Sequence, residues 1–288
     1  MEREEMDRLV QKLHETSLKI VLDIDQYCKE NGLTYYLSGG SCLGAARHKG
    51  FIPWDHDADL MMPREDYEKF LLHFEEAMGG KYGVGSLLTE KNWIRTYSKI
   101  WDTKTILKEK NISEMDRGVS IDIFAIDGLP TNAFLRKLYY QKTKVLSYFR
   151  YQLIRTSWGE HEPFRHVKKF FAQHWGERGS RFFSKWIDNS AKKYSFATSQ
   201  YVGVSTACHY WDKETIEKKY MESAVFLPFE GKELPVVNGY EKYLTNLYGK
   251  DYMQLTKEFA EREMEQQYKY VDRWEIIFLD SDDTEREN

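Results

Sequence analysis

The sequence of 288 residues contains no run of about 18 apolar residues, the length that a helix needs to cross a bilayer. Only 18 glycines and 6 prolines are present, too few for a collagen-like or low-complexity chain. With 41% hydrophobic and 31% charged residues, the composition is typical of a folded globular protein and not of a disordered one. The length is sufficient for one large domain or two smaller ones.

The sequence also has few cysteines and no excess of charge of one sign. Its three cysteines, Cys28, Cys42 and Cys208, are far apart and lack metal-ligand spacing, which indicates a reducing compartment without disulfides. The 42 basic and 46 acidic residues give a net charge of -4, so no general attraction to nucleic acid or anionic lipid is expected. The charged first residues contain no apolar signal segment. We therefore expect a cytoplasmic protein that does not bind nucleic acid.

The spacing of apolar residues predicts an α+β fold, a mixed sheet flanked by helices with a helical second lobe. Apolar residues recur every three or four positions in predicted helices at 6–28, 41–47 and 67–78, and they alternate in predicted strands at 33–37, 54–62, 93–101 and 119–126. The composition suggests four parts: a core at 1–130, a basic aromatic helical lobe at 131–200, a portion packing back on the core at 201–279, and an acidic tail at 280–288.

Three aspartates in the predicted strand 54–62 indicate a cation site. If the strand is regular, Asp55, Asp57 and Asp59 share one face about 7 Å apart, where like charges repel unless a cation lies between them. Asp122, on another predicted strand, adds a fourth carboxylate, and such oxygen ligands suit Mg²⁺. The alternative for each aspartate is a solvated strand face. A calcium loop is disfavoured because Leu60 stands where that loop requires glycine.

A turn upstream of these aspartates has the residues of a phosphate site. Ser38, Gly39, Gly40 and Ser41 precede a predicted helix, whose first backbone amides can bind a phosphate. A pair of glycines is more often only a turn, but here a carboxylate-rich strand follows within twenty residues. The two features together predict a site for a nucleoside diphosphate and its metal ion.

Four further polar residues have weaker predictions. Arg47 lies at a helix end and either contacts phosphate or interacts with the helix dipole. Lys99 either neutralises the donor or is a half-exposed strand lysine. A regular strand directs His56 away from the neighbouring aspartates, and Asp127 beside a glycine is predicted to be a turn residue.

The same segments carry a resemblance to a known family. The run LSGGSCLGAARHKGFIPWDHDAD at 37–59 resembles the LicD family, which includes bacterial phosphocholine transferases and the fukutins. The resemblance continues through PREDY at 63–67, KIWD at 99–102, IDIFAIDGLP at 121–130, and blocks at 228–231, 243–244 and 247–253. One departure is His56, which replaces the acidic residue usual at this place.

The resemblance implies a fold and a set of site residues. The fold is that of a nucleotidyltransferase of the DNA polymerase β type. Asp57 and Asp59 match the metal pair and Asp122 the third acid, so that these three are the implied catalytic residues, with Asp55 as a further metal ligand. The turn 38–41 matches the segment that faces the donor phosphates. The implied cofactor is Mg²⁺, with Mn²⁺ as an alternative.

The resemblance also implies an activity: transfer of a phospho-alcohol, either phosphocholine or an alditol phosphate, from a CDP-linked donor such as CDP-choline. The acceptor is a sugar hydroxyl on a cell-surface glycan or a lipid-linked precursor, as in the biosynthesis of polysaccharides or teichoic acid. Two alternatives stay open: a nucleotidyltransferase acting on a small molecule, and a non-catalytic protein that binds a nucleotide or a cation.

The predicted basic aromatic lobe has an excess of cations. Between 134 and 185 there are twelve Lys or Arg residues against Glu160, Glu162 and Glu177. Three explanations compete, in this order: solvated faces of packed helices, a landing surface for a lipid-linked acceptor at the inner membrane leaflet, and nucleic-acid binding. The second predicts a cytoplasmic protein in peripheral contact with the membrane inner face.

Overall fold

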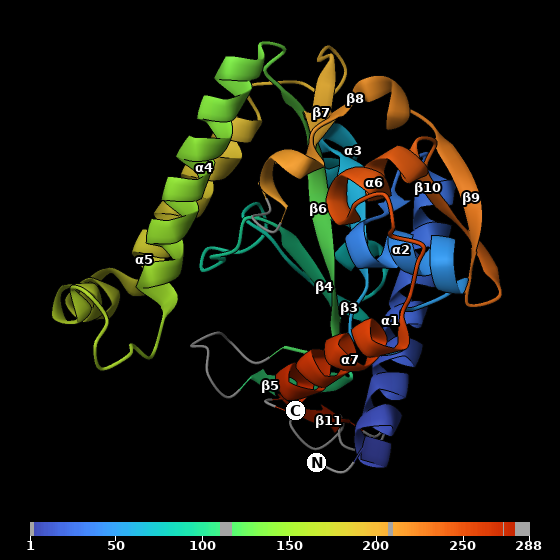
Figure 1. Ribbon diagram of the computed structural model, residues 1–288, viewed down its shortest axis with the longest axis horizontal. Helices are drawn as coiled ribbons and strands as arrows, with labels where there is room; N and C mark the ends of the chain where they lie inside the picture. Colours follow the sequence, from blue (N-terminus) through green and yellow to red (C-terminus); the bar gives the residue numbers. More distant parts are fainter. Residues whose placement is uncertain (1–2, 110–116, 207–209, 273, 280–288) are drawn as a thin grey trace.

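A seven-stranded mixed sheet forms the centre of the protein (Figure 1). The structure is a computed structural model and describes residues 3–109, 117–206, 210–272 and 274–279. The strand order is β1-β2-β6-β4-β3, and β7 and β8 extend the sheet from β6. Only β2 and β6 are parallel; the other pairs in this sheet are antiparallel. The strands are β1 Tyr36–Leu37, β2 Asp59–Pro63, β3 Tyr82–Gly85, β4 Ser98–Asp102, β6 Ser120–Leu129, β7 Tyr201–Gly203 and β8 Ile216–Glu217. The predicted α+β class is confirmed.

Three helices of the first 80 residues pack on this sheet. They are α1 (Arg3–Asn31), α2 (Gly39–His48) and α3 (Arg64–Ala77). The apolar faces predicted for the first and third helices are buried in one core together with β2 and β6, for example through Ile20 and Phe70, neither of which is exposed. The hydrophobic spacing therefore predicted these helices correctly.

Four local predictions require correction. The segment 54–58 is not a strand: β2 begins at Asp59, because the chain first turns, with the Asp55 N–H bonded to the Ile52 carbonyl. The predicted strands at 33–37 and 93–101 are reduced to Tyr36–Leu37 and Ser98–Asp102. Helix α2 begins at Gly39 and not at Ser41, so both glycines lie in its first turn.

The segment 131–200 contains a pair of packed antiparallel helices, α4 (Ala133–Ile154) and α5 (Arg165–Ala191). Asn132 caps α4, its side chain accepting hydrogen bonds from the Phe134 and Leu135 amides. Gly176 interrupts the helical geometry of α5 (φ 27°, ψ -121°), and the first part of the helix turns away from the rest (Figure 1). We call residues 133–191 the helical hairpin.

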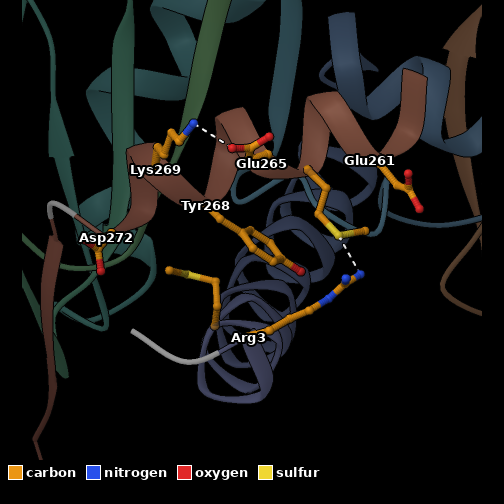
Figure 2. A pocket seen from close by; sticks show the side chains of 8 residues that line it. Arg3, Glu261, Glu265, Tyr268, Lys269 and Asp272 are labelled. Carbon is orange, nitrogen blue, oxygen red and sulfur yellow. Dashed lines mark hydrogen bonds and ion pairs between the residues drawn. The ribbon is translucent and has the colours of Figure 1, made fainter. Parts of the chain in front are cut away.

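The C-terminal part returns to the core through β9 (Ala224–Phe229), β10 (Lys232–Val237), α6 (Tyr240–Tyr248), α7 (Lys257–Val271) and β11 (Trp274–Phe278). Strand β11 pairs with β5 (Thr105–Glu109). Figure 2 shows Arg3 of α1 reaching α7, where it donates to the Met264 sulfur at 3.2 Å; Tyr268 of α7 donates to Asp7 of α1. The predicted acidic tail 280–288 and Cys208 lie outside the described residues. In the described part, no helix is both long and apolar enough to traverse a membrane.

Candidate functional site

Strand register places three charged residues in one row across the sheet. Asp59 on β2 is paired with Asp122 on β6, and Asp122 is paired on its other side with Lys99 on β4. The Lys99 Nζ lies 2.5 Å from Asp122 Oδ1. Burial lowers the pKa of Lys99, but the interactions with Asp122 and Tyr97 together raise it above the ordinary value, so Lys99 stays cationic. This row gives the centre of the site two carboxylates and one fixed positive charge.

The turn before β2 adds two further carboxylates. Asp55 and Asp57 are hydrogen-bonded to one another through their side chains, and the Asp55 carbonyl is 2.6 Å from His14 Nε2 on α1. Burial raises the pKa of both Asp55 and Asp59 well above the ordinary value, and the charge of Asp57 raises them further. Without a counter-charge these carboxyl groups therefore favour the protonated form, and a bound cation would stabilise their anions.

The first turn of α2 faces these carboxylates. A Cβ added at Gly40 would lie 2.8 Å from Asp55 Oδ2, and one added at Gly39 would lie 3.4 Å from Asp59 Oδ2. Gly39 has φ +45°, a conformation that L side chains rarely adopt. The Ser38 side chain does not cap the helix; its hydroxyl and the Gly39 N–H both bond to the Tyr243 hydroxyl, at 3.2 and 3.3 Å.

A cavity of about 770 Å³ joins these features. Its walls include Asp55, Asp57, Asp59 and Asp122 together with Ser38, Gly39, Gly40 and Arg47. Two of the predicted site residues, Ser41 and Lys99, do not line the cavity. The Ser41 hydroxyl accepts a hydrogen bond from the Asp59 amide (2.9 Å), and Lys99 forms an ion pair with Asp122. The guanidinium of Arg47 donates to the Tyr252 carbonyl (3.0 Å) at the cavity wall.

Another part of the cavity wall comes from residues that sequence reasoning missed. Tyr210 and Tyr248 stack edge to face with ring centroids 5.4 Å apart, and Glu214, Tyr252 and Phe259 line the same cavity. These residues lie about 150 or more positions after the first aspartates, and no local spacing links them to the site. The available signal was the presence of Tyr248 and Tyr252 in a block that resembles the family.

Two minor predictions were wrong. His56 does not point away from its neighbours: its Nε2 lies 3.5 Å from Asp57 Oδ2, because residues 55–58 follow a turn and are not part of a strand. Asp127 is not a turn residue but a fully buried member of β6, and both of its carboxylate oxygens bond to Arg64, at 2.7 and 2.6 Å.

Comparison with known proteins matches the part of the chain that contains this site. Residues 32–155 match the LicD/FKTN/FKRP nucleotidyltransferase domain, and this range contains all four aspartates and α2. This chain carries a LicD-family domain. The sequence is 29% identical to lipopolysaccharide cholinephosphotransferase LicD of Haemophilus influenzae over 254 residues, 85% of this chain and 91% of the relative. A 63-residue stretch, 22% of this chain and 12% of the relative, is 41% identical to ribitol 5-phosphate transferase FKRP of Homo sapiens. The family predicted from the sequence is confirmed.

The carboxylates of this LicD-family site suit a hard divalent cation by chemistry, since all of their ligand atoms are oxygens. Among the described residues, however, no three His, Cys, Asp or Glu side chains already stand grouped as ligands of one metal ion. The prediction that Asp57, Asp59, Asp122 and Asp55 hold the metal stays a prediction.

We expect Gly40→Val to weaken binding of a CDP-linked donor at least about tenfold, because its branched side chain would displace the Asp55 carboxylate and cover the first amides of α2. Gly40 has no positive φ, so the fold should survive. Isothermal titration calorimetry with CDP-choline measures the effect. Gly159→Val is the matched control, since a Cβ there meets no atom within 4 Å. Unchanged affinity in a folded Gly40→Val protein would place the phosphates elsewhere.

We expect Glu214 to make stability depend on pH. Burial raises the pKa of Glu214 to about 8, although a hydrogen bond with Tyr243 acts in the opposite direction. The folded protein thus holds a proton that the unfolded chain releases above about pH 4.5. The stability contributed by protonated Glu214 is lost as pH rises from there to about 8, by about 1.4 kcal/mol per pH unit.

The difference in unfolding free energy between wild type and Glu214→Gln isolates this contribution from other groups. Urea denaturation at pH 5, 6, 7 and 8 should show that the unfolding free energy of Glu214→Gln increases relative to that of the wild type as pH rises. Parallel curves for the two proteins would contradict the assignment of a neutral Glu214.

Proposed function

We propose that this protein transfers a phospho-alcohol from a CDP-linked donor to a sugar hydroxyl of a cell-surface glycan or its precursor, with Mg²⁺ or Mn²⁺ as cofactor. The observation that carries the proposal is the cavity in which the first turn of α2 faces Asp55 and Asp59, within the matched domain. The broader class, a phosphotransferase of the LicD type, is confirmed by the relatives.

In this proposal the residues around the cavity have separate tasks. The first amides of α2 bind the donor phosphates, since a helix N-terminus favours negative charge. Asp55, Asp57 and Asp59 hold the metal ion, which offsets charge on the phosphates when bound. The aromatic wall at Tyr210 and Tyr248 offers ring faces to the cytosine or, where the alcohol carries a quaternary ammonium group, to that cation.

The reaction needs no covalent enzyme intermediate. The acceptor oxygen attacks the phosphorus that bears the alcohol, a new P–O bond forms, and the P–O bond to CMP breaks, so that CMP leaves. The proton of the hydroxyl passes to a carboxylate of the cluster. Asp122 is suited to this task, because it stands on a separate strand and Lys99 fixes its position.

One experiment separates the alternatives. The protein is incubated with Mg²⁺, glycan extract and, in turn, CDP-choline, CDP-ribitol, CDP-glycerol and CTP, and products are identified by mass spectrometry. Release of CMP with addition of the phospho-alcohol to the glycan supports the proposal. Release of pyrophosphate from CTP, or transfer of CMP to the acceptor, would instead show a nucleotidyltransferase. Nucleotide binding without any product would show the non-catalytic alternative.

A further inference from the structure

Exposed apolar side chains concentrate on the helical hairpin. Among the described residues, 21 large hydrophobic side chains are exposed, and 14 of them lie between 134 and 186. Monomeric soluble proteins rarely expose contiguous apolar patches of this kind unless they mark an interaction surface. The fourteen are Phe134, Leu135, Leu138, Val145, Tyr148, Phe149, Tyr151, Phe164, Val167, Phe170, Phe171, Trp175, Phe182 and Trp186.

One group of these rings crosses from α4 to α5. Phe149 of α4 stacks on Phe183 of α5 with centroids 5.8 Å apart, and Phe183 contacts Phe182 at 5.5 Å. Tyr148 and Trp186 extend the group at either end, at 5.7 and 5.9 Å from their neighbours. The two helices therefore share one continuous aromatic surface and do not present isolated rings.

A second group lies beyond the break at Gly176, in residues 165–175 of α5. Phe171 contacts Phe170 at 5.8 Å and Trp175 at 6.0 Å, and these three side chains are 45–61% exposed. This part of α5 projects away from the body of the protein (Figure 1).

The basic charge of the hairpin is partly used inside the protein. Arg155 and Lys168 both bond to Glu162, at 2.7 and 2.8 Å, so they neutralise a carboxylate of the connecting segment. Arg181 donates to the carbonyls of Glu90 and Trp93 and thereby attaches the hairpin to the core.

Other cations of the hairpin remain available to a partner. Lys169, Arg178 and Lys185 are exposed and form no ion pair with any other residue that the structure describes. All three lie on α5, the helix that also carries Phe171, Trp175, Phe182 and Trp186. The exposed part of α5 therefore contains both aromatic side chains and cations that have no ion pair in the described part of the chain.

We propose that the helical hairpin binds an anionic lipid bilayer surface, with its aromatic side chains at the headgroup boundary and its free cations on the lipid phosphates. Aromatic and basic residues on one helical surface are the combination that anionic interfaces attract. A second copy of the chain is a poorer occupant, because two such surfaces would bring positive charge against positive charge. The proposal does not depend on the chemistry of the cavity.

The test is sedimentation of the whole protein with vesicles of phosphatidylcholine alone or with 30% phosphatidylglycerol. The wild type should bind the anionic vesicles at least about tenfold more tightly than the neutral ones, and less at high salt because charge is screened. Both the triple variant Lys169→Glu, Arg178→Glu, Lys185→Glu and the double variant Phe171→Ser, Trp175→Ser should lose at least about tenfold in affinity. Lys168 is left intact, since its reversal would break the pair with Glu162.

The matched control is Lys104→Glu, Lys232→Glu, Lys242→Glu, three exposed lysines elsewhere with the same change of net charge, and it should bind like the wild type. Quenching of tryptophan fluorescence by brominated lipid should fall in Trp175→Phe. Absence of binding to anionic vesicles overturns the proposal. So does a dimer in sedimentation equilibrium that the double serine variant abolishes, which would make this surface an interface between copies. Release of CMP from a CDP-linked donor should be the same in all variants, so failure here is distinct from failure of the proposed function.

Discussion

Asp59→Asn is expected to lower turnover by at least about a hundredfold, equal to about 2.7 kcal/mol of transition-state stabilisation. The substitution removes one charge from the carboxylates that we assign to the metal ion, while the side chain keeps its size and its place at the start of β2. The same change should leave the free energy of unfolding unchanged or higher. Burial and the neighbouring aspartates both disfavour the Asp59 anion, which raises its pKa, so a neutral amide relieves that cost.

This prediction is checked by CMP release at saturating donor and by urea denaturation of the same samples. Asp57→Asn should behave in the same way. Glu76→Gln is the control, because it removes one charge from an exposed position of α3 far from the cavity wall. Turnover within tenfold of the wild type in a folded Asp59→Asn protein would remove the proposed metal site.

Arg64→Ala is expected to destabilise the protein by about 3–5 kcal/mol. Arg64, the first residue of α3, donates to Asp127 through two nitrogens and to Asp188 of α5 at 2.9 Å. Burial raises the pKa of Asp127 and Arg64 lowers it, so loss of the guanidinium leaves a fully buried carboxylate without its partner. The site should lose activity only to the extent that the protein unfolds.

Chemical denaturation measures this loss, and two further variants test its cause. Arg64→Ala combined with Asp127→Asn should recover part of the stability, because the unpaired charge is gone. Arg262→Ala, an exposed arginine beside Glu263, should cost no more than about 0.5 kcal/mol. A loss below about 1 kcal/mol for Arg64→Ala would mean that water or another cation replaces the guanidinium.

The helices that pack on the sheet could be predicted from sequence because their apolar residues recur at the spacing of one helix face, and that face is buried. The three aspartates at 55–59 were predicted to lie together through a regular strand, whereas a turn at 52–55 brings Asp55 and Asp57 beside Asp59. The alternation of apolar and polar residues at 54–62 predicted a strand. The same alternation is compatible with a turn, whose backbone hydrogen bond joins residues only three positions apart. The site residues drawn from this region stay predictions until the variants are measured.

The rest of the cavity depends on contacts that no local pattern encodes. The pairing of Lys99 with Asp122 depends on the register between β4 and β6. The position of the aromatic wall depends on how α6 and the segment before it pack against α2. Nothing in the sequence singles out Glu214, and the block that contains Tyr243 does not show that its hydroxyl bonds to the first turn of α2.

The hydrogen bond from the Gly39 amide to the Tyr243 hydroxyl joins residues 204 positions apart, and it has a consequence for how the protein forms. A ribosome that has synthesised the matched domain through residue 155 has made every aspartate of the cluster but neither Tyr243 nor Tyr248. The first turn of α2 therefore gains its hydrogen bond with Tyr243 only late in translation. Contacts between residues so far apart in sequence slow folding. We expect a nascent chain halted near residue 155 to be inactive, and activity to appear only after the segment containing α6 has emerged and docked.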